Sequence, residues 1–171
     1  KGRGKIFDIA LKKYNIFNKE LVQKLINVYR GHKPEIKVFN GVIPLLSRFG
    51  KKYKIALITD GLLSVQKGKV KALGIEKFID VVVYTNEFQK PKPHPFAFEK
   101  VAKDLEADFK NMIYIADDPN KDFIGAKGLG IVTTRVYQGR FTDLGLSKLY
   151  EADYRVDNIL ETEELLNNIK F

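Results

Sequence analysis

The chain has 171 residues, which suits one main domain with room for a small accessory piece. A hydrophobic fraction of 44%, with 12 Phe and 8 Tyr, excludes a disordered chain. No cysteine occurs, so disulfides and thiolate metal sites are excluded, as fits a cytoplasmic protein. No apolar run approaches the roughly 20 residues that a membrane-spanning helix needs, so we expect no membrane partner.

The net charge of +9 raises nucleic acid as a partner. The lysines are scattered, however, and acidic residues lie between them. They are spread over positions 12–13, 51–54, 67–71 and 100–103, with no arginine stripe interleaved with aromatic residues. We therefore expect a solvated lysine-rich surface that also attracts phosphorylated ligands, and no nucleic-acid partner.

The first forty residues predict two helices and a linker. Apolar residues recur at helical spacing in two groups: Ile6, Phe7, Ala10, Leu11 and Tyr14, then Leu21, Val22, Leu25, Val28 and Tyr29. Asn18 is a candidate N-cap for the second helix, which Gly31 and the following Pro34 should end. Residues 31–40 are interpreted as the linker.

From Gly41 onward, short apolar segments alternate with amphipathic ones. The apolar segments predict strands at 53–58, 78–84, 112–116, 131–136 and 154–156. The amphipathic segments between and around them predict helices at 42–49, 62–73, 98–105, 123–127 and 160–169. This pattern indicates an α/β fold with a Rossmann-like parallel sheet and flanking helices. Ligands bind such sheets beyond the carboxyl ends of the strands.

Thr59-Asp60-Gly61 follows the first predicted strand. A hydroxyl at a strand end, followed by a turn glycine, can present the hydroxyl and backbone N–H groups to an anion. A capping turn that starts the next helix explains the same residues. On their own, these three residues fit the capping turn better.

A rigid arm, Glu87 to Pro95, follows the second predicted strand. Its three prolines fix the backbone and favour extended conformations at the preceding residues. Such an arm can hold a lysine ammonium in place to neutralise phosphate charge. A proline-stiffened surface loop with solvated lysines is an equally good explanation.

Ala116-Asp117-Asp118-Pro119-Asn120-Lys121-Asp122 follows the third predicted strand. Clustered carboxylates are the ligands that Mg²⁺ prefers. Helix capping by Asp118 or Asp122 is the alternative, but it leaves Asp117 at the end of an apolar strand unexplained. The functional interpretation, a magnesium site, is therefore favoured here.

The remaining special residues indicate no further chemistry. His32 and His94 lie far apart and show no metal-ligand spacing, so we interpret both as structural or surface residues. The glycines at 125, 128 and 130 form no dinucleotide fingerprint and are interpreted as helix-end turns.

Taken in order, these segments resemble three of the four motifs of the haloacid dehalogenase superfamily. Ile58-Thr59-Asp60-Gly61 is similar to motif II, and Lys92-Pro93-His94-Pro95-Phe96-Ala97-Phe98 to motif III. Asp117 to Asp122, with the glycine-rich turn after it, is similar to motif IV. The resemblance covers about residues 41–138, and the order and strand context of the motifs make it specific.

The resemblance implies a role for each matching residue. Thr59, Asp60 and Gly61 would bind the phosphoryl group, with Thr59 as its hydrogen-bond donor. Lys92 would be the catalytic cation, since the helix register of Phe98 fits Lys92 better than Lys90. Asp117 would ligate Mg²⁺, and Asp122 and Asp118 would support that site.

In one respect the chain departs from the family pattern. Members begin with an apolar strand ending in Asp-x-Asp, whose first Asp is the nucleophile, and no such strand precedes Thr59. Asp8, within a predicted helix, is no substitute. We therefore expect residues 1–40 to be part of a helical cap, and 41–171 to be a core that lacks its first strand. That strand would lie between the strands ending at Thr59 and Asp117.

The implied function is a Mg²⁺-dependent phosphatase that acts on a small phosphorylated metabolite through an aspartyl-phosphate, with the chain as given incomplete for catalysis. A non-catalytic phosphate-binding or regulatory module is the alternative. A receiver domain is disfavoured because its acidic pair should come early in the chain. A nucleic-acid-binding domain rests on charge alone.

Overall fold

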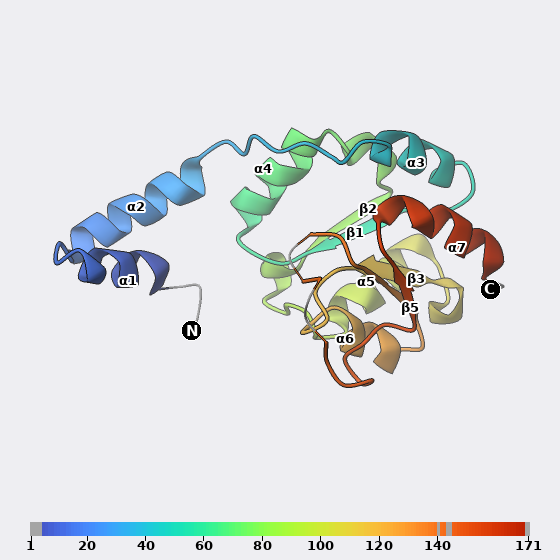
Figure 1. Ribbon diagram of the computed structural model, residues 1–171. Coiled ribbons are helices and arrows are strands. Elements are labelled where there is room, and N and C mark those ends of the chain that lie inside the picture. The colour runs from blue at the N-terminus through green and yellow to red at the C-terminus, as the bar shows by residue number, and fades with distance from the viewer. Residues whose placement is uncertain (1–4, 140, 143–144, 170–171) are drawn as a thin grey trace.

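The computed structural model describes residues 5–139, 141–142 and 145–169, and it shows an α/β fold of parallel strands with flanking helices (Figure 1). The helices are α1 (Ile6–Lys13), α2 (Lys19–Gly31), α3 (Val42–Phe49), α4 (Leu63–Leu73), α5 (Phe96–Leu105), α6 (Phe123–Gly128) and α7 (Thr162–Asn168). The strands are β1 (Ala56–Thr59), β2 (Val81–Tyr84), β3 (Ile113–Ala116), β4 (Val132–Val136) and β5 (Tyr154–Val156). Short 3-10 helices occupy Glu76–Phe78, Thr85–Phe88, Phe109–Asn111 and Ile159–Glu161.

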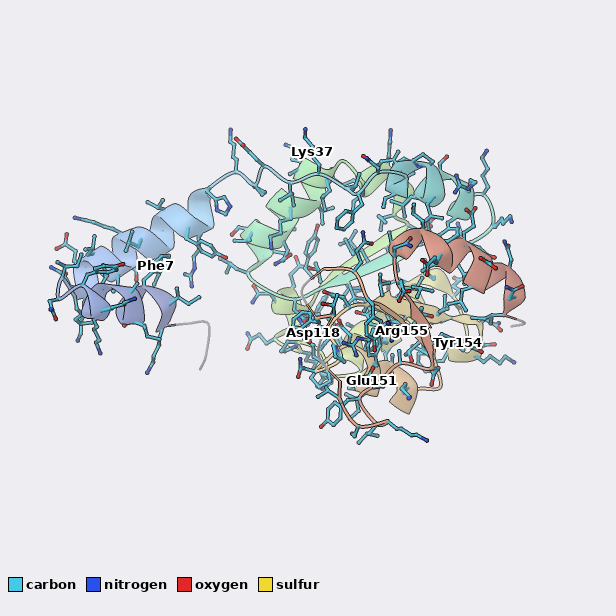
Figure 2. The ribbon with its side chains drawn as sticks, viewed as in Figure 1. Phe7, Lys37, Asp118, Glu151, Tyr154 and Arg155 are labelled. Atoms are coloured by element: carbon cyan, nitrogen blue, oxygen red, sulfur yellow. The ribbon has the colours of Figure 1, made fainter. Side chains whose placement is uncertain are left out.

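Helices α1 and α2 form a hairpin that stands away from the strands (Figure 1). The Asn18 side chain accepts hydrogen bonds from Glu20 and Leu21 N–H groups, which confirms the predicted cap of α2. Leu11 and Val22 are buried between the two helices. Figure 2 shows Phe7 of this hairpin well separated from Asp118 at the strand ends. Phe7 therefore lies far from the region where the motifs meet.

The parallel strands pair in two separate sheets. One contains β1 and β2, and the other contains β3, β4 and β5 in that order. Within the part of the chain that the structure describes, no pairing joins β1 to β3. A cavity of about 480 Å³ lies between them, bordered by residues 55–58 on one side and 112–115 on the other. The interruption falls between the strands that end at Thr59 and Ala116, where the resemblance places a further strand.

Helix α5 packs against both sheets. Its Ala97 and Val101 form a cluster with Val83 of β2, and its Phe98 forms a second cluster with Ala126 and Ile131. Ile58 of β1 and Met112 pack against both clusters. Burial of apolar surface against a shared helix thus holds the two sheets together where strand pairing does not.

Two strands, β1 and β2, begin three residues later than predicted. The Asp80 carboxylate accepts a hydrogen bond of 2.8 Å from Ile55 N–H, and the Ile55 carbonyl accepts one of 2.8 Å from Asp80 N–H. These bonds use the backbone of Ile55, so β1 starts at Ala56 and not at Tyr53. The 3-10 helix at Glu76–Phe78 likewise delays β2.

The interpretation of Gly125 as a helix-end residue is wrong. It lies within α6, where an added Cβ would come 2.2 Å from the Pro93 carbonyl oxygen. Only glycine allows this contact between α6 and the proline arm.

Among the helices described, none is long and apolar enough to cross a bilayer.

Candidate active site at the strand ends

The end of β1 presents a hydroxyl and a glycine turn. The Thr59 hydroxyl donates to the side-chain oxygen of Gln66 in α4 at 3.0 Å. Gly61 adopts φ +120°, a conformation that side-chain-bearing residues rarely reach, and a Cβ there would lie 2.7 Å from the Gln66 amide nitrogen. Gln66 therefore closes the space in front of the Thr59 and Gly61 pair.

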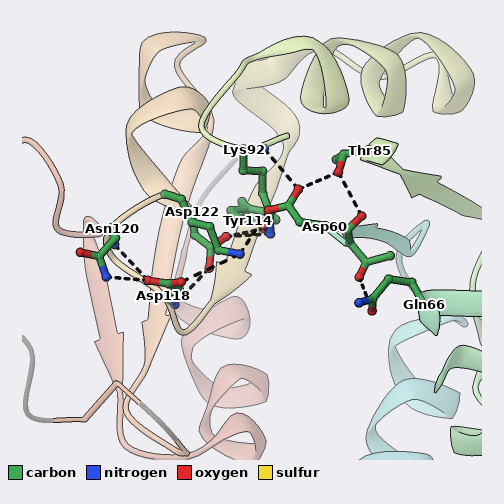
Figure 3. Close-up of polar contacts among 10 residues, drawn as sticks. Asp60, Gln66, Thr85, Lys92, Tyr114, Asp118, Asn120 and Asp122 are labelled. Carbon is green, nitrogen blue, oxygen red and sulfur yellow. Dashed lines mark hydrogen bonds and ion pairs between the residues drawn. The ribbon is translucent and has the colours of Figure 1, made fainter. Parts of the chain in front are cut away.

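Asp60 accepts three hydrogen bonds from three separate segments (Figure 3). The donors are the Thr85 hydroxyl at 2.8 Å, the Lys92 N–H at 3.2 Å and the Lys121 ammonium at 3.2 Å. Partial burial by itself would raise the pKa of Asp60, but the Lys92 charge and these donors outweigh it and hold the pKa below its ordinary value. The carboxylate thus ties the end of β1 to the proline arm.

Lys92 points from the arm into the protein. Its ammonium lies 2.7 Å from Asp122 Oδ1 and donates to the Tyr114 hydroxyl at 2.9 Å, and its side chain is only 8% exposed. Lys90, by contrast, is exposed and stacks 4.3 Å from the centre of the Phe96 ring. Burial, followed by the nearby Asp122 charge, raises the pKa of Tyr114 well above its ordinary value, so its hydroxyl stays protonated.

The segment after β3 folds around its own carboxylates. Asp118 accepts from the Asn120 backbone at 3.2 Å and side chain at 2.8 Å, and Asp122 accepts from Asp118 N–H at 3.0 Å. Asp122 precedes α6, yet its side chain makes no capping hydrogen bond. Its carboxylate is directed instead to Lys92, so the alternative explanation of Asp122 as a helix cap does not hold.

Asp117 is in a different situation from the other aspartates. Burial, then the charges of Asp122 and Asp118, raises the pKa of Asp117 above its ordinary value. The four aspartates of the site also outnumber its two lysines, Lys92 and Lys121. A cation beside Asp117 would relieve this repulsion.

The donor set fits a magnesium ion that takes only part of its shell from this chain. Across residues 5–139, 141–142 and 145–169, no group of three or more acidic or histidine side chains converges to hold a metal. Mg²⁺ commonly uses one or two protein carboxylates and fills the rest of its shell with water and phosphate oxygens. Asp117 can supply one such carboxylate.

Most of the predicted site residues thus meet at one edge. Asp60, Lys92, Asp118 and Asp122 form a connected polar network, and Thr59 joins it because its carbonyl accepts from the Thr85 hydroxyl at 3.3 Å. Four members were not predicted: Thr85, Gln66, Tyr114 and Lys121. Thr85 directly follows β2, so the rule that led to Thr59 could have found it, whereas Tyr114 lies inside an apolar strand and gave no such signal.

Comparison with known proteins gives a consistent result. Residues 5–136 match the family of haloacid dehalogenase-like hydrolases. Two archaeal proteins named glyceraldehyde 3-phosphate phosphatase are similar in sequence. The one from Methanocaldococcus jannaschii is 32% identical over 68% of this chain and 50% of its own length, and the one from Methanopyrus kandleri is 30% identical over 81% and 60%. The chain thus spans about half to three fifths of the length of these relatives.

A solved structure shares the fold. The crystal structure of a HAD phosphatase from Thermococcus onnurineus superimposes with a TM-score of 0.67 at 23% identity. The alignment covers 96% of this chain and 72% of that one. At this level of identity the likeness concerns the fold alone.

Proposed function

This chain belongs to the haloacid dehalogenase-like hydrolase family, and we propose that it forms the larger part of a magnesium-dependent phosphatase. The reaction would be hydrolysis of a small phosphomonoester through an aspartyl-phosphate. The nucleophilic Asp would come from a segment outside these 171 residues.

The observation that carries this proposal is the meeting of three kinds of group at one sheet edge. A strand-end hydroxyl (Thr59), a buried ammonium (Lys92) and an acid with a raised pKa (Asp117) follow three different chain segments and meet around one network. Phosphoryl transfer requires mainly positioning and charge neutralisation, and these groups supply both.

Each residue has a distinct task in this scheme. The Thr59 hydroxyl and Gly61 N–H would bind phosphoryl oxygens, once Thr59 has left its present acceptor Gln66. Lys92 would offset the negative charge of the phosphoryl group, and Asp122 keeps its ammonium directed into the site. Asp117 would hold Mg²⁺, which when bound supplies further neutralisation of phosphate charge.

The cavity between β1 and β3 supports the proposed origin of the nucleophile. Among residues 5–139, 141–142 and 145–169, no strand pairs with β1 or β3 on this side, and a buried unpaired group costs about 1–3 kcal/mol. A parallel strand inserted there would satisfy both edges. Its carboxyl end would emerge between Thr59 and Asp117, where an attacking carboxylate is needed.

For the substrate we propose a small phosphorylated metabolite in the cytoplasm. The names of the two archaeal relatives make glyceraldehyde 3-phosphate the first compound to test. Other sugar phosphates, nucleotides and phosphoglycolate belong in the same panel. The net charge of +9 is suited to attracting such anions.

The test compares the 171-residue chain with a chain extended by the sequence that its gene encodes upstream. Both are assayed for Mg²⁺-dependent phosphate release from the panel, and intact mass confirms each chain. We expect turnover only from the extended chain, and its loss when the upstream strand-end Asp is changed to Asn. Robust turnover by the 171-residue chain would overturn the proposed nucleophile. An inactive extended chain that still binds phosphate would favour a non-catalytic module.

A further inference from the structure

The ammonium of Lys92 has two partners inside the protein. Asp122 Oδ1 lies 2.7 Å away, and the Tyr114 hydroxyl accepts a hydrogen bond from Lys92 at 2.9 Å. The same hydroxyl donates to Asp122 Oδ1 at 3.4 Å, which closes a triangle of three polar groups (Figure 3). Tyr114 thus contacts both members of the ion pair.

The ring of Tyr114 is held in place by packing. Tyr114 lies in the middle of β3, and its ring meets that of Phe98 edge to face, with centroids 4.9 Å apart and an interplanar angle of 85°. Phe98 itself is only 1% exposed. A buried aromatic pair on a strand and a helix fixes the hydroxyl more firmly than a loop residue would.

We infer that Tyr114 is a positioning residue that holds the Lys92 ammonium at one point in the site. The inference rests on the proposed function, in which Lys92 offsets phosphoryl charge. A lysine is a point charge on a flexible four-carbon stem, and one carboxylate allows its ammonium to move over a wide arc. The Tyr114 hydroxyl supplies a second acceptor at a fixed direction and so selects one position on that arc.

The replacement Tyr114→Phe separates positioning from packing, because it keeps the ring against Phe98 and removes only the hydroxyl. Tyr84→Phe is the matched control, since Tyr84 ends β2 and its ring faces Lys67, outside the network. Both variants are made in the extended, active chain. We expect Tyr114→Phe to lower kcat by about 3- to 100-fold with KM changed less than about 2-fold, because misplacement of a charge weakens the transition state most. Tyr84→Phe should match the parent.

A double-mutant cycle with Lys92→Ala then tests whether Tyr114 acts through Lys92. In the Lys92→Ala background, Tyr114→Phe should have no further effect on kcat. An unchanged kcat in Tyr114→Phe, or an equal loss with and without Lys92, would overturn the inference. If Lys92→Ala itself keeps full activity, the proposed function fails instead.

A spectroscopic measurement covers the case in which Lys92→Ala leaves no measurable rate. With ¹⁵N-labelled lysine, the buried Lys92 ammonium should give a slowly exchanging NMR signal, which Lys92→Arg removes and thereby assigns. Tyr114→Phe should broaden or abolish this signal, and Tyr84→Phe should leave it intact. A signal that persists unchanged in Tyr114→Phe would show that Asp122 alone positions the ammonium.

Discussion

Asp60 and Asp117 occupy equivalent positions in the two sheets and have opposite surroundings. Each is the first residue after a parallel strand, β1 for Asp60 and β3 for Asp117, and each is partly buried. The pKa of Asp60 lies below its ordinary value, whereas that of Asp117 lies above it. Burial acts in the same direction on both, so neighbouring groups decide the difference.

The neighbours of Asp60 are donors, whereas acids outweigh the Lys92 charge in their effect on Asp117. The Asp60 carboxylate accepts hydrogen bonds from Thr85, Lys92 and Lys121, which compensate its charge within the protein. Asp117 faces Asp122 and Asp118, which oppose its charge. The comparison shows that a strand-end acid can be either compensated or opposed by its neighbours, and the second case suits our proposal that Asp117 binds a cation. It predicts different consequences when each charge is removed.

The largest effect should come from removing the Asp117 charge in the active, extended chain. We expect Asp117→Asn to lower Mg²⁺-dependent phosphatase activity by at least about 100-fold, because the metal loses a protein ligand. The control is Asp108→Asn, an exposed aspartate before β3. Activity is titrated with Mg²⁺ for each variant. Unchanged activity and metal dependence in Asp117→Asn would remove Asp117 from the site.

A somewhat smaller effect should distinguish the two lysines of the arm. Lys92→Ala should lower kcat/KM by roughly 100-fold, since its ammonium lies among the acids, and Lys90→Ala by less than about 3-fold, since Lys90 lies outside on the Phe96 ring. Circular dichroism must accompany the assay, because removing Lys92 leaves Asp122 buried without its cation. A larger loss in Lys90→Ala would show that the register of the motif is wrong.

Much of this arrangement could be predicted from periodicity and from where strands end. The parallel α/β fold and the Asn18 cap follow from local patterns, because they depend on neighbours in sequence. The strand-end rule directed attention to Thr59 and Asp117, and the resemblance to the haloacid dehalogenase motifs selected Lys92.

The remainder depended on contacts that no local pattern contains. The start of β1 is set by Asp80, which is 25 residues away in sequence from Ile55. Gly125 is required by the carbonyl of Pro93, and Tyr114 belongs to the site only because the arm brings Lys92 to it. Sequence spacing also could not tell that the pKa of Asp60 is lowered while that of Asp117 is raised, since the direction depends on which charges the fold places nearby.

A smaller effect, on stability, should follow loss of the Asp60 charge. Asp60→Asn should lower the free energy of unfolding by about 1–3 kcal/mol at pH 7, since donors on Thr85, Lys92 and Lys121 lose a charged acceptor. Because the folded-state pKa is below the ordinary 3.8, this contribution is present above pH 3.8 and is lost as the pH falls through the lowered value. Urea unfolding from pH 7 to pH 3 measures it, with Asp108→Asn as control. If Asp60→Asn loses as much free energy of unfolding at pH 3 as at pH 7, the effect would come from the shape of the side chain and not from its charge.

The smallest effect should have the opposite sign and appear at Asp117. Its folded-state pKa is raised, so its contribution to stability is favourable below pH 3.8 and is lost as the pH rises through the raised value. In metal-free buffer at pH 7, Asp117→Asn should therefore raise the free energy of unfolding by less than about 1 kcal/mol, because it ends the repulsion with Asp122 and Asp118. Its urea unfolding midpoint should be higher than that of the parent. Added Mg²⁺ should make the parent more stable than Asp117→Asn, because metal binding stabilises only the chain that retains the carboxylate. A metal-free Asp117→Asn chain that is less stable than the parent would mean that Asp117, like Asp60, is a structural tie.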